Sequence, residues 1–125
     1  METAEIEYVP ANLQSHVFVR TLCEQKVVYQ TLRMAKSVFV WIGFSSDPTF
    51  SDISMAMKTP YSPSPLVTQV MGMQADTASC SLAARLSKRL DKPVYVSFNL
   101  PSDSLTLNAV EAQISEEIKN FPEKF

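Results

Sequence analysis

The run SVFVWIGF at residues 37–44 constrains the fold more than any other part of the chain. Its density of β-branched and aromatic residues favours a β-strand. Because successive side chains of a strand point to opposite faces, alternation divides the run into one face with Val38, Val40, Ile42 and Phe44 and a second with Phe39, Trp41 and Gly43. Both faces are apolar, so the sheet that contains this strand needs a cover on each side.

Other β-rich or alternating runs predict strands at residues 13–23, 26–34, 53–58, 66–71 and 94–100. Residues 35–37 form a plausible turn, and residues 45–48 form a loop by their turn chemistry. Three prolines, Pro60, Pro63 and Pro65, exclude a helix and any central strand between the fourth and fifth of these runs.

Apolar residues at helical spacing predict two amphipathic helices. The first is capped by Asp76, runs to about Leu90 and cannot continue past Pro93. Its stripe consists of Ala78, Leu82, Leu86 and Leu90. The second helix is capped by Ser102, Asp103 or Ser104 and ends at Pro122, with a stripe formed by Leu107, Val110, Ile114, Ile118 and Phe121.

The order of these elements predicts an α+β fold. The early strands follow one another without crossover helices, so they should pair mostly antiparallel. We therefore expect a mostly antiparallel sheet of about six strands, with both helices on one face and the other face packed on a partner subunit. Residues 1–12 are polar and aperiodic and read as a flexible lead-in, which leaves residues 13–125 as a single domain.

Charge and hydropathy exclude several functional classes. The net charge of −2 gives no general attraction to nucleic acid or to anionic membranes. No segment approaches the ~20 consecutive apolar residues that span a bilayer, and the acidic N-terminus does not read as a secretory signal. We therefore expect a protein of the cytosol or nucleus, in which Cys23 and Cys80 do not form a disulfide.

The chain offers little material for catalysis. His16 is the only histidine, and in mid-strand it reads as a half-exposed structural side chain. With two separate cysteines, the sequence supplies no usual metal-ligand spacing. Gly43 and Gly72 are the only glycines, too few and too far apart for a phosphate-binding loop. We expect no catalytic, metal or cofactor site.

Three further polar residues have ordinary structural interpretations. Glu116 and Glu117 are adjacent, so on a helix they cannot face each other, and we expect both on a solvated surface. Cys80 lies near a helix N-terminus, which can activate a thiol, but it has no second cysteine at redox spacing and reads as a small residue on the helix flank. An enzyme that uses Cys80 or His16 remains the least favoured alternative.

The uncovered sheet face is the feature that indicates a partner. Each helix has a single apolar stripe, so the pair can cover only one face of the sheet. Phe39 and Trp41 lie on one face of the most apolar strand, and Phe18 joins them if the strand register allows. An exposed apolar patch of this kind usually marks an interface. The alternative is that the loops at residues 45–52 and 59–65 fold over it.

A short basic patch lies at the end of the first predicted helix. Arg85, Lys88 and Lys92 share one side of the helix by their spacing. Without interleaved aromatic residues, this patch does not suggest single-stranded nucleic acid. It either complements the helix dipole or docks an acidic surface of a client protein.

Four segments together resemble the proteasome assembly chaperone 4 family. They are DTASCSLAARLSKRLDKPVYVSFNL at residues 76–100, SVFVWIG at residues 37–43, Ala56-Met57, and the tail EEIKNFPEKF at residues 116–125. They occur in the family's order, and the resemblance covers about residues 13–125. The loop at residues 45–52 is longer than the resemblance leads us to expect.

The resemblance implies a function that composition does not. Such proteins form a heterodimer with proteasome assembly chaperone 3, help to order the alpha-subunit ring of the core proteasome, and leave before maturation is complete. No cofactor or nucleotide is implied. We also expect that the isolated chain can form a homo-oligomer. The alternative is a small dimeric α+β adaptor or trafficking module that is unrelated to the proteasome.

Overall fold

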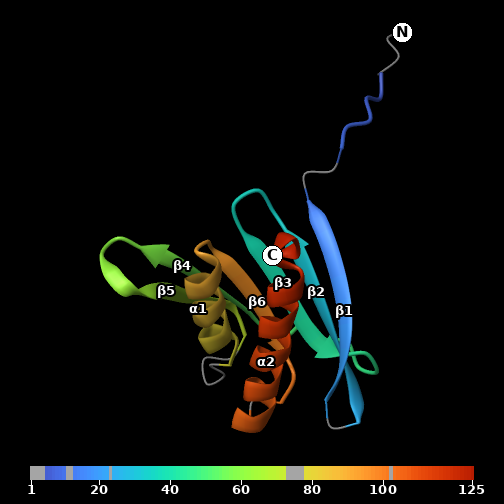
Figure 1. Ribbon diagram of the computed structural model, residues 1–125, viewed down its shortest axis with the longest axis vertical. Coiled ribbons are helices and arrows are strands. Elements are labelled where there is room, and N and C mark those ends of the chain that lie inside the picture. The colour runs from blue at the N-terminus through green and yellow to red at the C-terminus, as the bar shows by residue number, and fades with distance from the viewer. Residues whose placement is uncertain (1–4, 11–12, 23, 73–77, 102) are drawn as a thin grey trace.

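A computed structural model describes residues 5–10, 13–22, 24–72, 78–101 and 103–125 of the chain (Figure 1). These residues form a six-stranded sheet with two helices packed against one face. The strands are β1 (Gln14–Leu22), β2 (Gln25–Arg33), β3 (Val38–Phe44), β4 (Ile53–Thr59), β5 (Ser62–Met71) and β6 (Val94–Asn99). The helices are α1 (Ala78–Leu90) and α2 (Ser104–Asn120), and a short 3-10 turn, η1 (Pro122–Lys124), follows α2.

The sheet has the strand order β1-β2-β3-β6-β4-β5. Neighbouring strands are antiparallel except for β3 and β6, which run parallel because β4, β5 and α1 intervene between them in the chain. The predicted α+β fold, with a mostly antiparallel sheet and both helices on one face, is confirmed. Figure 1 shows α1 and α2 side by side in front of the sheet.

Strand β5 begins earlier than the sequence predicts, at Ser62 instead of residue 66. Pro63 and Pro65 therefore lie inside a strand, although neither can donate a hydrogen bond to a ladder. This is tolerated because β5 is an edge strand, which pairs with β4 on one side only. The prolines therefore exclude a central strand here, as expected, but they allow an edge strand.

Both helices begin and end close to their predicted bounds. The cap predicted at Asp76 lies outside the described residues. At α2 the cap is Asp103, whose side chain accepts a hydrogen bond from the backbone N–H of Thr106 at 2.6 Å. This hydrogen bond holds the pKa of the Asp103 carboxyl below its usual range, since it stabilises the charged form.

The core lies between the helices and one face of the sheet. Register places Phe18, Tyr29, Ile42 and Phe98 in one row across β1, β2, β3 and β6, and all four are buried. Helix α1 buries Leu82 and Leu86 over β4 and β6, and α2 buries three residues, Val110, Ile114 and Ile118, in the same core.

Residues 5–10 extend away from the domain with every side chain exposed (Figure 1). The flexible lead-in at residues 1–12 stays a prediction. Neither described helix is long and apolar enough to cross a membrane.

A candidate partner-binding face

The sheet face opposite the helices is apolar and partly open. Register carries one outward row through Leu32, Phe39, Tyr95 and Met55, with Met57 and Leu66 beside it. The first four of these are partly exposed, and Met57 and Leu66 are exposed. Among the described positions that the register directs to this side, Lys26 is the one charged residue, and it lies at the rim. We call this surface the outer face.

Trp41 lies flat along β3 instead of projecting from the outer face. The next residue on the same side is Gly43, and a Cβ atom placed there would lie 2.5 Å from Cη2 of the indole. Two carbon atoms cannot approach so closely, so the absent side chain of Gly43 is what makes room for the ring. The indole N–H in turn donates to the backbone carbonyl of Thr49 at 2.9 Å.

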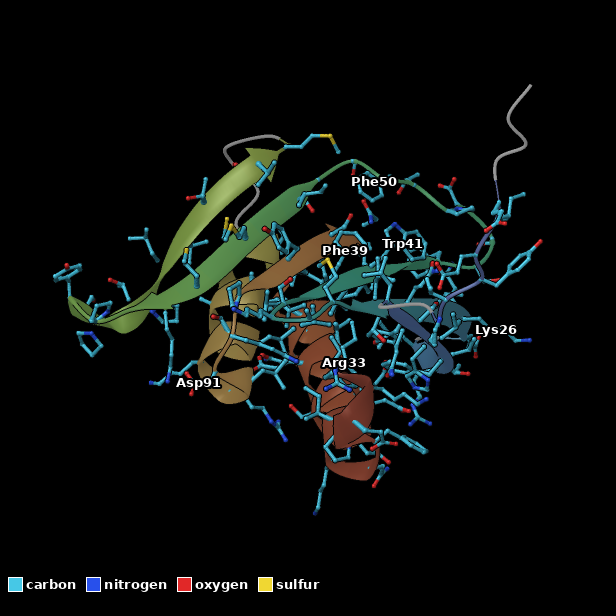
Figure 2. The ribbon with its side chains drawn as sticks, turned by 90° about the horizontal axis from the view of Figure 1, so that it is seen from above. Lys26, Arg33, Phe39, Trp41, Phe50 and Asp91 are labelled. Carbon is cyan, nitrogen blue, oxygen red and sulfur yellow. The ribbon has the colours of Figure 1, made fainter. Side chains whose placement is uncertain are left out.

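The loop at residues 45–52 covers one end of the outer face. Phe50 stacks on Phe39 with ring centroids 6.1 Å apart and an interplanar angle of 21°. Figure 2 shows Phe50 above the sheet, with Phe39 and Trp41 beneath it and the helices on the far side. One of the two loops that were alternatives to a partner therefore does lie on this face. The other segment, residues 59–65, belongs to the β4–β5 hairpin and extends away from the centre of the sheet (Figure 1).

A cleft of about 460 Å³ lies between this loop and the sheet. Its lining consists of Gln30, Leu32, Phe39, Trp41, Pro48 and Phe50. The side chains that line it are apolar except for the Gln30 amide and the indole N–H of Trp41, which is bonded to Thr49. No charged side chain is among these described residues. Such a cleft suits an apolar group with at most one hydrogen-bonding atom.

The register does not bring Phe18 to the outer face. Phe18 pairs with Tyr29 and lies in the core row, stacked on the Tyr29 ring with centroids 4.6 Å apart. Its exposed fraction is 8%. Of the three predicted interface residues, Phe39 and Trp41 therefore share the outer face, and Phe18 serves the core on the other side.

The three residues of the predicted basic patch have separate surroundings. Arg85 forms an ion pair with Glu111 of α2, and the Lys92 ammonium donates to the carbonyl of Phe125. Partial burial, with a contribution from the charge of Arg33, lowers the pKa of Lys92. Lys88 is exposed. Arg85 and Lys92 thus tie α1 to α2 and to the end of the chain, on the helix side of the molecule.

Glu117 is not on a solvated surface, so its predicted exposure is wrong, whereas Glu116 is exposed. The exposed fraction of Glu117 is 3%, and its two carboxylate oxygens lie 2.9 Å from Arg20 Nη2 and 3.2 Å from His16 Nε2. A buried carboxylate requires such partners. One sequence signal was available: Glu117 is three residues after Ile114 and so falls on the buried stripe of α2.

A second buried polar cluster joins the outer-face loop to α1. The Asp52 carboxylate accepts hydrogen bonds from the Ser79 hydroxyl at 2.6 Å and from the Phe98 backbone N–H at 3.0 Å. Ser54 Oγ lies 2.7 Å from Ser79 Oγ and 3.1 Å from Cys80 Sγ. Cys80 is thus a partly buried hydrogen-bonding residue at the start of α1. Within the described ranges, no three His, Cys, Asp or Glu side chains gather to hold a metal ion.

Comparison with known proteins identifies the family. The family model described as proteasome assembly chaperone 4 matches residues 26–100, well over half of the chain. Mouse proteasome assembly chaperone 4 is 39% identical over 116 residues, which cover 92% of this chain and 93% of the mouse protein. The chain belongs to the proteasome assembly chaperone 4 family.

Two further comparisons agree with this assignment. The human member of the family is also 39% identical, over 111 residues that cover 88% of this chain and 89% of the human protein. A chain from a crystal structure described as a novel chaperone complex for yeast 20S proteasome assembly superposes with a TM-score of 0.64. That match covers 90% of this chain and 97% of the yeast-complex chain at 14% identity, so it shows the shared fold.

Proposed function

We propose that the chain is a proteasome assembly chaperone that forms a heterodimer with proteasome assembly chaperone 3 through its outer face. The pair then helps alpha subunits of the core proteasome to assemble into the correct ring. The observation that carries the proposal is the outer face itself. In the part of the chain that the structure describes, this face is apolar and uncharged in its interior, and the loop at residues 45–52 covers one end of it. A stable complex buries such a face against a partner of similar character.

A sheet-on-sheet contact fits this face best. Two packed sheets lie about 10 Å apart and interdigitate apolar side chains from their inner faces. The outer face offers Phe39, Tyr95 and Met55 in register for such packing. Because α1 and α2 lie on the other side, they would form the exterior of the heterodimer.

The helix side is then available for clients. We propose that Arg85, Lys88 and Lys92 attract acidic surfaces of alpha subunits, mainly by raising the association rate at low salt. Since reversing Arg85 would also break its ion pair with Glu111, the charge is tested best at exposed Lys88. Lys88→Glu should slow association with alpha subunits at low salt. Equal association rates for wild type and Lys88→Glu at every salt concentration would reject this docking role.

The proposal is one of binding, without catalysis, cofactor or metal. Cys80→Ser and His16→Ala should therefore leave chaperone activity unaffected in an alpha-ring assembly assay, once thermal melts show that each variant is folded. Some loss of stability is expected for His16→Ala, because it removes one partner of Glu117. We place the protein in the cytosol or the nucleus, where the core proteasome is built. Cell fractionation that found it in a membrane-enclosed compartment would contradict this location.

Affinity purification at native expression level, followed by mass spectrometry, tests the proposed function. The expected bound proteins are proteasome assembly chaperone 3 and immature alpha subunits. An adaptor or trafficking module unrelated to the proteasome would recover neither, and that result would overturn the proposal. Purification from cells that lack chaperone 3 separates direct alpha-subunit contacts from those that need the heterodimer.

A further inference from the structure

We infer that Phe50, on the loop at residues 45–52, is a specificity-determining contact of the outer face, and that Asp52 and Asn99 are the positioning residues that hold it there. The occupant of the adjacent cleft is an apolar side chain of the partner chaperone. This inference rests on the proposed function and names a residue that the strand pattern alone does not single out.

The loop is anchored at four positions, Ser45, Thr49, Ser51 and Asp52, although its residues have no regular secondary structure. At its start, the N–H of Ser45 donates to the carbonyl of Lys26 at 3.1 Å. Thr49 accepts from the Trp41 indole, and the N–H of Ser51 donates to Asn99 Oδ1 at 2.9 Å. The loop ends at Asp52, which is buried and bonded to both α1 and β6.

The anchors are themselves fixed. The amide nitrogen of Asn99 donates to the carbonyl of Ile42 at 3.2 Å and to the Ser97 hydroxyl at 2.9 Å, so its oxygen can only face the loop. The Asp52 carboxylate satisfies the N–H of Phe98 just beyond the residues where β4 pairs with β6. The Asp52 side chain thus accepts the hydrogen bond from β6 at a position where the main chain has already turned away from β6 toward the outer face.

These anchors fix the backbone of loop residues 45–51, whose side chains are exposed. Fixing the backbone of one residue costs about 1–2 kcal/mol in conformational entropy, and residues 45–51 bury little in return. Phe50 is 52% exposed even though it stacks on Phe39. A loop that is held rigid while it presents a large apolar side chain to solvent is pre-organised for binding, because the entropic cost has been met before the partner arrives.

The lining of the cleft defines the occupant. Among the described residues, no charged side chain lines it, so an acidic or basic peptide would lose its hydration there without gaining a partner. The cleft is continuous with Phe39 of the proposed sheet-on-sheet contact. An apolar side chain at the edge of the partner's sheet is therefore the group that fits, with the Gln30 amide available for one hydrogen bond.

The test uses two exposed aromatic residues as a matched pair. Phe50→Ala removes the proposed contact, and Tyr61→Ala removes an aromatic residue that is 95% exposed between β4 and β5. With purified chaperone 3 in a calorimetric titration, Phe50→Ala should raise the dissociation constant about thirtyfold, the scale of an aromatic residue that anchors an interface. Tyr61→Ala should leave it unchanged, and neither variant should shift the melting temperature of the isolated subunit appreciably.

Trp41 provides an independent readout of the loop, because it is the only tryptophan in the chain and donates to Thr49. In wild type its emission should shift to shorter wavelength, and acrylamide should quench it less, when chaperone 3 is added. Asn99→Ala removes the Ser51 anchor together with the hydrogen bonds to Ile42 and Ser97. It should increase quenching and weaken binding, with only a small fall in the melting temperature. Asp52→Ala should show the same effects more strongly, with some loss of subunit stability because its carboxylate is buried.

The outcomes separate this inference from the proposed function. If the wild-type pair forms and Phe50→Ala binds as tightly as wild type, the inference is wrong and the proposed heterodimer stands. If Phe50→Ala weakens self-association in ultracentrifugation but not binding to chaperone 3, the occupant is a second copy of this chain and our assignment of the partner is wrong. Failure of the wild-type protein to bind chaperone 3 at all contradicts both.

Discussion

The two faces of the sheet are built from similar residues but have opposite surroundings. On the helix side, Tyr29, Ile42 and Val96 are covered by α1 and α2 and have no solvent exposure. On the outer side, Leu32, Phe39 and Tyr95 are equally apolar in character but remain partly exposed. Apolar content alone therefore does not decide which face is a core. The helices make a core of one face by covering it, whereas the loop at residues 45–52 covers only one end of the other.

The difference teaches how stability and binding can be divided within a small domain. A residue on the helix side contributes to folding of the isolated subunit, whereas a residue on the outer side contributes mainly once a partner arrives. Substitutions on the first side should shift unfolding, and those on the second should shift association. The following variants are chosen to break or sharpen this division.

Ile114→Ala should have the largest effect on folding. Ile114 is fully buried between α2 and the sheet, and truncation leaves a cavity that the rigid sheet cannot fill. We expect a loss of about 3 kcal/mol in the free energy of unfolding, measured by urea denaturation. A loss below about 1 kcal/mol would mean that α2 packs loosely and that the helix side is less of a core than its burial indicates.

Arg20→Met should have the next largest effect, because it leaves the buried Glu117 carboxylate with His16 alone. Arg20 is partly exposed, so the expected loss is about 2 kcal/mol, less than for a fully buried pair. The double variant Arg20→Met, Glu117→Gln should recover part of this loss, since no charge is then left unpaired. Additive losses in the double-mutant cycle would show that the two side chains are not coupled.

Gly43→Ala should have an intermediate effect that appears on the outer side. The added methyl group would force the Trp41 indole out of its position over β3, at a cost of about 1 kcal/mol to the subunit. Since the indole N–H would then lose Thr49, we also expect a longer-wavelength emission maximum and weaker binding to chaperone 3. Unchanged emission would show that Trp41 is not held by the absence of a side chain at Gly43.

Asp103→Ala should have the smallest effect, a modest fall in melting temperature that depends on pH. The Thr106 hydrogen bond lowers the pKa of Asp103 in the folded state, so its contribution is present above the unfolded pKa of about 3.9 and is lost as the pH falls through the folded value. The difference between wild type and variant should therefore shrink in acid. The difference in melting temperature between Asp103→Ser and Asp103→Ala should not change with pH, because Ser keeps a cap and neither variant has a titrating group at this position.

Local sequence pattern was sufficient to predict most of the fold. Alternation in residues 37–44 correctly divided β3 into two faces, and helical spacing placed most of the apolar stripes of α1 and α2 toward the sheet. The last residue predicted for the second stripe, Phe121, lies beyond α2 and is exposed. The strand order and the single parallel pair followed from packing and not from any local signal. Strand β5 was predicted too short, from residue 66 instead of Ser62, because the prolines were given the penalty of a central strand although β5 is an edge strand.

The candidate site was less predictable because its contacts are distant in sequence. Phe18 and Trp41 could share a face only if the β1–β2 register allowed it, and a one-residue offset decides that question. Glu117 is buried by Arg20 and His16, which lie 97 and 101 residues away along the chain. The loop at residues 45–52 owes its position to Asn99 and Ser79, and no pattern within the loop reveals either anchor.

The central claim is that the outer face is the partner-binding surface, and a charge placed within this face tests it most directly. Met55 lies between Tyr95 and Thr68 on this face, away from the loop and its anchors. Leu105, in the first turn of α2 and exposed on the helix side, is the matched control. Both Met55→Glu and Leu105→Glu replace an apolar side chain with a carboxylate, and thermal melts of each isolated subunit check folding.

Calorimetric titration of each variant with proteasome assembly chaperone 3 gives the decisive comparison. Burying an unpaired carboxylate costs several kcal/mol, so Met55→Glu should weaken the heterodimer by roughly a hundredfold or more. Leu105→Glu should bind as wild type does, since a negative charge is tolerated in the first turn of a helix. If folded Met55→Glu binds chaperone 3 as tightly as wild type, the outer face is not the interface.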